Sequence, residues 1–342
     1  MLQVLDKLPD GLLAYTADQL QSVLGGPTLI HLPGRIEPPL FVSVLMHGNE
    51  TVGWDALRQL LPRYAVAGGE QALPRSLSIF IGNVAAAEQS VRHLDGQPDY
   101  NRVWPGCERE VAKQHSAEAL MMQQVVDAMR QRDVFAAIDI HNNTGLNPHY
   151  ACINVINDAF LHLATLFGRT VVFFTDPCQV ASNAMARLCP SVTLECGKVG
   201  QQHGIDHATQ YLDACLHLSE FPEHAVAEQD YDLFHTVATV KIPPEVSFSF
   251  GEHAVDLCLL EDIEYLNFRE LPAGTHFARL ARHNNLPLDV RNEQGEQVRE
   301  RYFRVDGDQL LLATPVMPSM LTTNETVIRQ DCLCYLMERY QI

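Results

Sequence analysis

The sequence has no apolar run long enough to cross a membrane. No stretch reaches the roughly 18 uninterrupted apolar residues of a spanning helix. The opening segment MLQVLDKLPDGLLAYTADQL carries acidic residues early and has no basic stretch followed by an apolar core, so it does not resemble a secretory signal. We therefore expect a cytoplasmic protein that does not associate with membranes.

Basic residues are scarce, and so are paired cysteines. Asp and Glu outnumber Lys and Arg by 42 to 24, and the formal net charge of −18 argues against a nucleic-acid partner, because phosphate backbones would be repelled. The nine cysteines are scattered, and only Cys332 and Cys334 are close, in a spacing that suits neither zinc nor redox chemistry. We expect reduced, mostly buried thiols.

The composition is that of a globular protein with more than one folding unit. Hydrophobic residues make up 46% of the 342 residues and charged residues 19%. A chain of this length is large enough for a catalytic domain and a smaller second domain. Internal repeats and low-complexity segments do not stand out.

Strands and helices alternate over the first two thirds of the chain. Almost unbroken apolar runs indicate strands buried on both faces, and apolar residues at helical spacing follow several of them. The pattern predicts an α/β fold over residues 1–225, with a mostly parallel, mixed sheet flanked by helices. The expected strands cover 41–46, 77–82, 134–140, 151–156, 171–175 and 191–196, and the expected helices cover 51–64, a segment capped by Ser116, 158–167 and 206–219.

The alternation of strand and helix patterns ends near residue 222. Prolines at 222, 243 and 244 interrupt the chain, helical periodicity fades, and short apolar segments alternate with turns. This pattern predicts a small β-rich domain over residues 230–342.

Residues with metal-binding side chains follow several of the expected strands. His47 and Glu50 come after the first, His141 after the third and Glu195 at the end of the last. Ligands of α/β sheets gather at the carboxyl ends of strands, so these residues can converge. A catalytic zinc takes three protein ligands and leaves one position open, which two His and one Glu satisfy. Asp139, two residues before His141, would point to the same side as a supporting partner.

Four motifs resemble one family in the same order and at similar separations. They are HGNE at 47–50, RHLDGQPDYNRVWPG at 92–106, DIH at 139–141 and LECG at 194–197. This succession resembles the succinylglutamate desuccinylase/aspartoacylase family, within the zinc carboxypeptidase-like enzymes. The segments EYLNF and PAGTHFARL in the C-terminal part resemble that family's β-rich domain.

The resemblance implies a metal site and a proton-transfer group. His47, Glu50 and His141 would bind Zn²⁺. Glu195 would act as the general base that activates the zinc-bound water, and then as the acid that protonates the leaving amine. Together these residues would make the chain a zinc-dependent hydrolase of a linear amide bond.

The resemblance also implies a site for the substrate. Arg92 would polarise the scissile carbonyl, and Asn101 with Arg102 would hold a substrate carboxylate. Two arginines would thus create a local positive region inside an acidic chain. His149 and Tyr150 are two further groups expected near the pocket, where the chain departs from the family pattern.

Three functions remain open from the sequence. The first is hydrolysis of a small N-acyl amino acid, and the second is a metallocarboxypeptidase that trims a C-terminal residue from a short peptide. The third is a non-catalytic zinc or ligand-binding protein, against which the presence of Glu195 argues. The sequence does not fix the acyl group, the amino acid or the oligomeric state, and a homo-oligomer is compatible with it.

Overall fold

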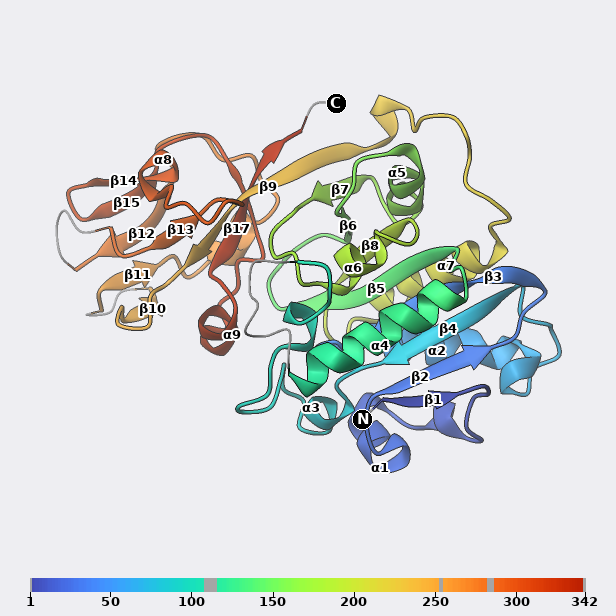
Figure 1. The fold of residues 1–342 in the computed structure, drawn as a ribbon. Coiled ribbons are helices and arrows are strands. Elements are labelled where there is room, and N and C mark those ends of the chain that lie inside the picture. The colour runs from blue at the N-terminus through green and yellow to red at the C-terminus, as the bar shows by residue number, and fades with distance from the viewer. Residues whose placement is uncertain (1, 108–115, 252–254, 282–285, 341–342) are drawn as a thin grey trace. The chain divides into compact units, whose positions relative to one another are not determined.

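The computed structural model describes residues 2–107, 116–251, 255–281 and 286–340 (Figure 1). The chain divides into two compact units. The first comprises Met1–Asn142 and His149–Asp232, and the second comprises Asn143–Pro148 and Leu233–Ile342. The short segment after Asn142 therefore belongs with the C-terminal unit, where the Asn147 side chain accepts a hydrogen bond from the Met320 N–H at 3.0 Å.

The first unit is built on a mixed sheet. Its strands lie in the order β1-β2-β4-β3-β5-β8-β6-β7. β2 is antiparallel to β4, and β6 is antiparallel to β8, whereas β3 is parallel to both β4 and β5. The strands are β1 (Gln3–Leu5), β2 (Thr28–Leu32), β3 (Ile36–Val44), β4 (Arg75–Ile81), β5 (Ala136–Asn143), β6 (Tyr150–Ile153), β7 (Thr170–Phe173) and β8 (Ser191–Lys198).

Helices cover both faces of this sheet (Figure 1). Alternate strand residues point to opposite faces, so Phe41 and Phe80 meet the apolar side of α4 while Val44 and Ile140 face α2. Gly53 lies at that second contact, where a Cβ atom would come within 2.6 Å of the Val44 side chain. The helices are α1 (Leu20–Leu24), α2 (Val52–Leu60), α3 (Val84–Glu88), α4 (Ala117–Gln131), α5 (Asp158–Thr165), α6 (Ala181–Met185) and α7 (Gln202–His217).

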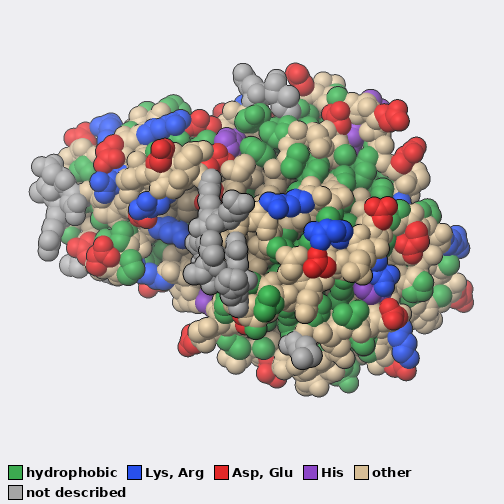
Figure 2. Space-filling view, in the orientation of Figure 1, with side chains coloured by type: hydrophobic (Ala, Val, Ile, Leu, Met, Phe, Trp, Pro, Cys, Tyr) green, Lys and Arg blue, Asp and Glu red, His purple; other side chains and the backbone are tan. Residues whose placement is uncertain are grey.

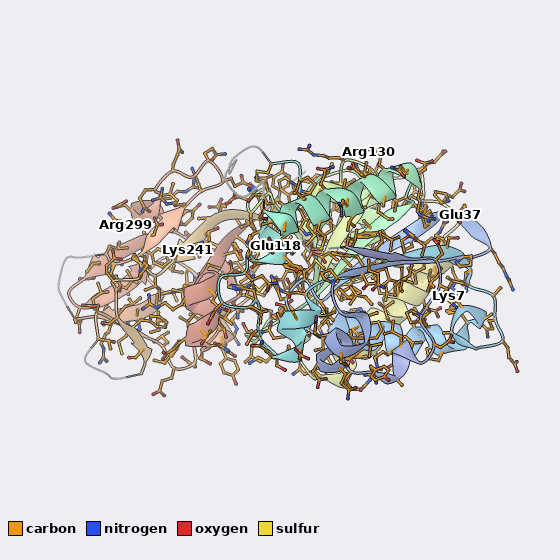
Figure 3. All side chains as sticks on the ribbon, turned by 60° about the horizontal axis from the view of Figure 1, so that its bottom comes forward. Lys7, Glu37, Glu118, Arg130, Lys241 and Arg299 are labelled. Carbon is orange, nitrogen blue, oxygen red and sulfur yellow. A yellow bond between two sulfur atoms is a disulfide. The ribbon has the colours of Figure 1, made fainter. Side chains whose placement is uncertain are left out.

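Local side chains fix where these helices begin and end. The Ser116 hydroxyl accepts a hydrogen bond from the Ala119 N–H at 3.1 Å, as the sequence predicts for the start of α4. Glu118 lies in the first turn and Arg130 in the last, so each charge complements the helix dipole (Figure 3).

One buried cation joins the sheet to the end of α7. Arg75 is 1% exposed and donates hydrogen bonds to the carbonyls of Pro38, Leu218 and Ser219, at 2.6, 2.7 and 3.1 Å. Its guanidinium also lies 3.8 Å from the centre of the Phe135 ring. The charge is thus dispersed over three carbonyl oxygens and a π face instead of a carboxylate partner.

The second unit is rich in β-structure. A five-stranded sheet has the order β10-β11-β12-β15-β14, and β9 pairs with β17 and β13. Apolar residues of both groups of strands form one buried cluster, which includes Val240, Phe277 and Leu310. The elements are β9 (Asp232–Lys241), β10 (Phe248–Phe250), β11 (Leu257–Leu259), β12 (His276–Leu280), β13 (Asp289–Arg291), β14 (Phe303–Asp306), β15 (Gln309–Leu312), β16 (Met317–Ser319), β17 (Cys334–Arg339), α8 (Arg299–Tyr302) and α9 (Glu325–Gln330).

The predicted fold class is confirmed: an α/β unit on a mixed sheet and a smaller β-rich part. The predicted strands and helices are present, but β5 runs three residues and β8 two residues further than the sequence indicates. His141 therefore lies within a strand, as Glu195 does. The N-terminal strands β1 and β2 were not predicted. No helix in the described ranges has both the length and the apolar character of a membrane span.

The surface shown in Figure 2 carries acidic and basic side chains interspersed with apolar ones. On this face the described Lys and Arg side chains lie singly or in small groups among acidic neighbours.

Candidate metal centre and active site

A tight turn after β3 carries the first two predicted metal ligands. The Glu50 N–H donates to the His47 carbonyl at 3.2 Å, which closes the turn and puts both side chains on one side. Gly48 lies against the backbone of α3, where a Cβ atom would come within 2.2 Å of the Ala87 nitrogen and 2.3 Å of the Ala86 carbonyl carbon. Only glycine allows this close approach.

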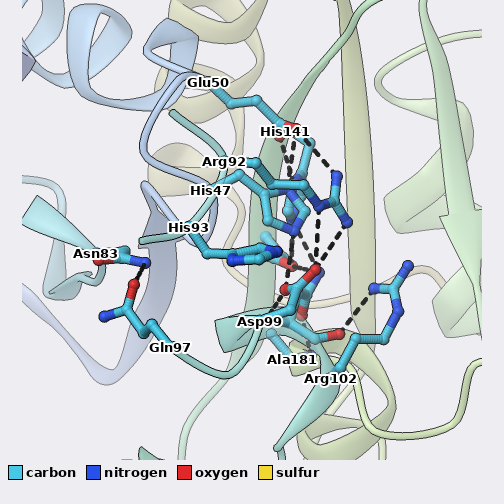
Figure 4. A network of polar contacts seen from close by, with 12 residues as sticks. His47, Glu50, Asn83, Arg92, His93, Gln97, Asp99, Arg102, His141 and Ala181 are labelled. Carbon is cyan, nitrogen blue, oxygen red and sulfur yellow. Dashed lines mark hydrogen bonds and ion pairs between the residues drawn. The ribbon is translucent and has the colours of Figure 1, made fainter. Parts of the chain in front are cut away.

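The structure brings His47, Glu50 and His141 together as a candidate metal site (Figure 4). One ligand atom from each lies within 4.8 Å of the others. Nδ1 of His47 lies 2.9 Å from Oε1 of Glu50, and Nδ1 of His141 lies 2.7 Å from Oε2. The three residues are 4%, 6% and 3% exposed, so the convergence that the sequence predicts takes place in a buried position.

Each imidazole is held by a second carboxylate. Nε2 of His47 lies 3.1 Å from Oδ1 of Asp99, and Nε2 of His141 lies 2.7 Å from Oδ2 of Asp139. In a neutral imidazole, an Nε2–H that donates to an aspartate leaves the lone pair on Nδ1, on the side of Glu50. Two imidazole nitrogens and a carboxylate oxygen that converge in this way are the donor set that zinc takes, so the residues fit zinc.

The electrostatics of the centre also favour a cation. Burial lowers the pKa of His141, but the charges of Asp139 and Glu50 outweigh it and hold that pKa well above 6.5. Burial would raise the pKa of Asp99, yet Arg92 and His47 hold it well below its ordinary value. The carboxyl groups of Glu50, Asp99 and Asp139 thus lie against two imidazoles, and the negative potential that favours a proton on His141 also attracts a metal ion.

Asp99 is a site residue that sequence reasoning missed. It caps the short 3₁₀ turn Tyr100–Arg102, where its side chain accepts a hydrogen bond from the Asn101 N–H at 2.8 Å. Its position just before the Asn-Arg pair was the one available signal. Its contact with His47 spans 52 residues, so only the tertiary structure reveals it.

Arg92 lies beside the metal centre, as expected for a group that acts on the substrate there. Its Nε and Nη2 atoms are 3.1 and 2.9 Å from Oδ2 of Asp99, and Nη1 is 3.9 Å from Oε1 of Glu50. The Arg92 carbonyl also accepts a hydrogen bond from the Gly48 N–H at 3.1 Å, which ties the two loops together.

Asn101 and Arg102 occupy different surroundings although they are adjacent. The Asn101 amide is 5% exposed, and it contacts Ala181 on one side and Asp139 on the other. Arg102 is half-buried, and its Nη1 donates to the Asn101 carbonyl at 2.9 Å. The structure thus places both predicted residues at the centre, with Asn101 deeper than Arg102.

Glu195 lies on β8 and is 6% exposed. Burial raises its pKa to about 8; the positive charge of His141 opposes this rise, and the negative charges of Glu50 and Asp139 reinforce it. A carboxyl group with this pKa holds a proton at neutral pH in the metal-free protein, and the charge of a cation bound beside it would lower that pKa and favour the carboxylate that a general base requires.

Asn142 connects the strand of Glu195 to Glu50 and the start of α2. Its side-chain oxygen accepts a hydrogen bond from the Val52 N–H at 3.1 Å, and its Nδ2 donates to the Gly197 carbonyl at 2.9 Å. Its backbone N–H lies 3.3 Å from Oε2 of Glu50. One buried amide therefore fixes the start of α2 against the end of β8.

The two further groups expected near the pocket behave differently. Tyr150 is 2% exposed and pairs directly with Glu195 across β6 and β8. Nδ1 of His149 lies 2.7 Å from Nδ1 of His207, so that ring packs against α7. Burial and the neighbouring His207 lower the pKa of His149 to about 4.

The expectation of reduced cysteines is wrong at one place. Cys107 and Cys178 form a disulfide across 71 residues, with Cα atoms 5.7 Å apart. The backbone N–H of Trp104 also donates to the Gln179 carbonyl at 3.2 Å, so the segment after Arg102 is joined to the segment before α6. The other seven cysteines are free, and all but Cys258 are buried.

Comparisons with known proteins agree with the resemblance that the motifs indicate. The family model described as "Succinylglutamate desuccinylase/Aspartoacylase catalytic domain" matches residues 37–220. These residues include every predicted site residue. No curated protein matches the chain.

Solved structures share the fold at low sequence identity. A succinylglutamate desuccinylase from Chromobacterium violaceum gives a TM-score of 0.54 at 19% identity, covering 82% of this chain and 86% of that one. A succinylglutamate desuccinylase/aspartoacylase from Rhodobacter sphaeroides gives 0.57 at 14%, covering 92% and 89%. Murine aminoacylase 3 gives 0.52 at 14%, covering 90% and 97%. These likenesses concern the fold.

Proposed function

Because the chain belongs to the succinylglutamate desuccinylase/aspartoacylase family, we propose that it is a zinc-dependent hydrolase that cleaves the amide bond of an N-acyl amino acid. The observation that carries this proposal is the buried group of His47, Glu50 and His141. Glu195 lies near this group, because the charges of His141 and Glu50 both influence its pKa. A site for metal binding alone would not need a buried carboxyl group with a raised pKa beside it.

The chemistry follows from the groups present. Zinc, when bound, supplies a Lewis acid and lowers the pKa of a coordinated water to about 7. Glu195 accepts a proton from the attacking water and returns it to the departing amine nitrogen, so one carboxyl group serves both steps. Arg92 donates hydrogen bonds to the carbonyl oxygen of the scissile amide, where negative charge develops.

Arg102 provides the best-placed cation for the substrate carboxylate. Its planar guanidinium can bind a carboxylate through two parallel hydrogen bonds, which a lysine cannot do. We propose the same role for Asn101, its partner in the Asn-Arg pair that the family resemblance indicates. We further propose that residues 1–225 form the catalytic domain and residues 230–342 a β-rich C-terminal domain.

The test is a hydrolysis screen with the zinc-loaded full-length protein. We expect release of free amine from one or more N-acyl amino acids and about one zinc per chain by elemental analysis. Glu195→Gln should abolish hydrolysis but retain zinc, whereas Glu223→Gln, which changes an exposed residue in the same way, should match the wild type. Release of C-terminal residues from short peptides in place of amine from acylated amino acids would instead indicate a carboxypeptidase.

A protein that binds zinc and hydrolyses neither substrate class would contradict the proposal. So would a Glu195→Gln variant that turns over substrate at the wild-type rate.

A further inference from the structure

The loop from Arg92 to Arg102 begins and ends with predicted substrate-binding residues, and a tight turn lies between them. The Gln97 N–H donates to the Leu94 carbonyl at 3.1 Å and closes this turn. Gly96 occupies its third position with a φ of 74°, a conformation that glycine adopts without strain. None of the predicted site residues lies in the turn, so other contacts must hold it in place.

The side chain of Gln97 holds this turn from two directions. Its Oε1 accepts a hydrogen bond from the Leu94 N–H at 3.1 Å, and because a backbone N–H can only donate, this contact identifies the oxygen end of the amide. The same oxygen accepts from Nδ2 of Asn83 at 2.8 Å (Figure 4). Nε2 faces the Tyr100 hydroxyl at 3.4 Å. One half-buried amide thus joins two parts of the loop to a residue outside it.

Asn83 is a well-fixed anchor for this contact. It is 1% exposed and caps α3, where its Oδ1 accepts from the Ala86 N–H at 3.2 Å. Its backbone N–H donates to the Leu45 carbonyl at 2.7 Å, just after β3. Because the cap uses Oδ1, Nδ2 remains as the donor for Gln97. The loop is therefore fastened to the start of a helix that also packs against the turn of the first metal ligands.

Tyr100 carries the contact into the turn that holds the Asn-Arg pair. Its side chain is 6% exposed and belongs to the apolar cluster around α4. Asn101 and Arg102 follow it directly in the 3₁₀ turn. A Gln97 amide that is fixed by Asn83 therefore limits where Tyr100 can lie, and with it the two residues that follow.

We propose that Gln97 is a positioning residue for the carboxylate site: it ties the loop to the N-cap of α3 and so sets the place of the Arg102 guanidinium. Gln97 itself does not contact the substrate, because both ends of its amide have partners in the protein. The inference rests on the proposed function in taking Asn101 and Arg102 as the groups that bind the substrate carboxylate. A displacement of about 1 Å at such a site can cost about 100-fold in rate, so a remote anchor can affect catalysis.

The test compares a variant that removes the anchor with one that keeps it. Gln97→Ala loses the hydrogen bonds of the side chain to Asn83, Leu94 and Tyr100. Gln97→Glu keeps an oxygen for the first two, and its second oxygen can accept from the tyrosine hydroxyl. Gln131→Ala is the matched control, because it makes the same substitution at the exposed end of α4.

The kinetic measurements use the zinc-loaded full-length proteins. The two compounds are the N-acyl amino acid that the wild type hydrolyses fastest and its carboxamide, which lacks the carboxylate. We expect Gln97→Ala to raise KM for the acid by about 10–100-fold and to leave KM for the carboxamide within about threefold of the wild type, because only the acid uses the displaced arginine. Gln97→Glu and Gln131→Ala should stay within about twofold for both compounds.

Hydrogen exchange gives a second measurement that needs no activity. Gln97→Ala should accelerate amide exchange in peptides that cover residues 94–102, because the loop loses its attachment to α3. Gln97→Glu and Gln131→Ala should leave exchange in these peptides as in the wild type. Bound zinc should stay at about one per chain in all of these proteins, because no variant changes a metal ligand.

An unchanged ratio of the two KM values in folded Gln97→Ala would overturn the inference, because a purely structural role lowers activity towards both compounds alike. Thermal unfolding followed by circular dichroism shows whether this variant is folded. If it is not, Gln97→Met, which keeps the length of the side chain, replaces it and must show the same change in the ratio.

A wild type that hydrolyses no acylated amino acid would refute the proposed function without deciding the role of Gln97. The hydrogen-exchange comparison would then decide it. Faster exchange over residues 94–102 in Gln97→Ala would support the anchor, and equal exchange in the two proteins would overturn it.

Discussion

The carboxyl group of Glu195 should make the metal-free protein less stable as the pH rises. Burial raises its pKa from 4.5 to about 8, so the folded state keeps a proton that the unfolded state loses above about pH 5. Unfolding between these two pKa values releases a proton, and an increase in pH therefore favours the unfolded state. Glu195→Gln removes this effect, because glutamine resembles the protonated acid and does not ionise.

The size of the effect follows from the two pKa values. Between the two pKa values, each pH unit lowers the free energy of unfolding of the wild type by about 1.4 kcal/mol. The decrease is smaller near either pKa, where the group is only partly ionised in one of the two states. The Glu195→Gln variant should therefore gain about 3.5 kcal/mol over the wild type between pH 5 and pH 8. Counted from pH 5, the gain should level off near 4 kcal/mol above pH 9.

Urea unfolding of the metal-free proteins at pH 5, 6, 7 and 8 measures this difference. Comparing two proteins at each pH cancels the contribution of His141, whose raised pKa also lowers stability as the pH increases. Glu223→Gln controls for the removal of one carboxyl group from an exposed position. A stability difference between Glu195→Gln and the wild type that stays constant across this range would show that Glu195 ionises normally, and the argument for its role would fail.

Four further outcomes are expected. Arg75→Leu should lower the free energy of unfolding by about 3–5 kcal/mol in urea titrations, because three carbonyls lose the donor that the buried Arg75 side chain supplies; a loss below about 1 kcal/mol would contradict this account. Asp99→Asn should weaken zinc binding by about 10–100-fold in chelator competition, and an unchanged affinity would show that its contact with His47 is unimportant. Cys178→Ser should destabilise the protein by up to about 4 kcal/mol under oxidising conditions but hardly at all in excess reductant, and equal effects in both would argue against the disulfide. Removing zinc with a chelator should lower the melting temperature, since zinc at about 1,000 times its Kd stabilises the folded state by about 4 kcal/mol; an unchanged melting temperature would mean that the metal does not bind the folded state.

The parts of the fold that the sequence predicts are those with a strong local signal. β3, β4, β5 and β8 are buried on both faces, so each is an apolar run that needs no knowledge of its neighbours. β1 was missed because it has three residues and is largely exposed, which leaves no periodic pattern to recognise. The ends of β5 and β8 were underestimated because His141, Asn142 and Asn143 continue the first strand and Gly197 and Lys198 the second, and none of these residues is apolar.

The candidate site likewise has residues that the sequence identifies and a contact that it does not. Side-chain chemistry and motif order identify His47, Glu50, His141 and Glu195, because two imidazoles and a carboxylate are what a catalytic zinc needs and the family pattern supplies their positions. The contact between Asp99 and His47 carries no such signal, because its residues come from separate loops. The folded chain alone brings these two side chains together.

The sequence by itself thus determined an α/β unit with a β-rich second unit, and the kinds of group available for binding a metal and moving a proton. Only the tertiary structure decided how those groups act on one another. The orientation of the Asn101 amide depends on the backbone of Ala181, 80 residues away, and the pKa of Glu195 depends on burial and on charges from other strands and loops. Hydrogen-bond direction and desolvation are properties of three-dimensional surroundings, whereas residue type and local periodicity can be read along the chain.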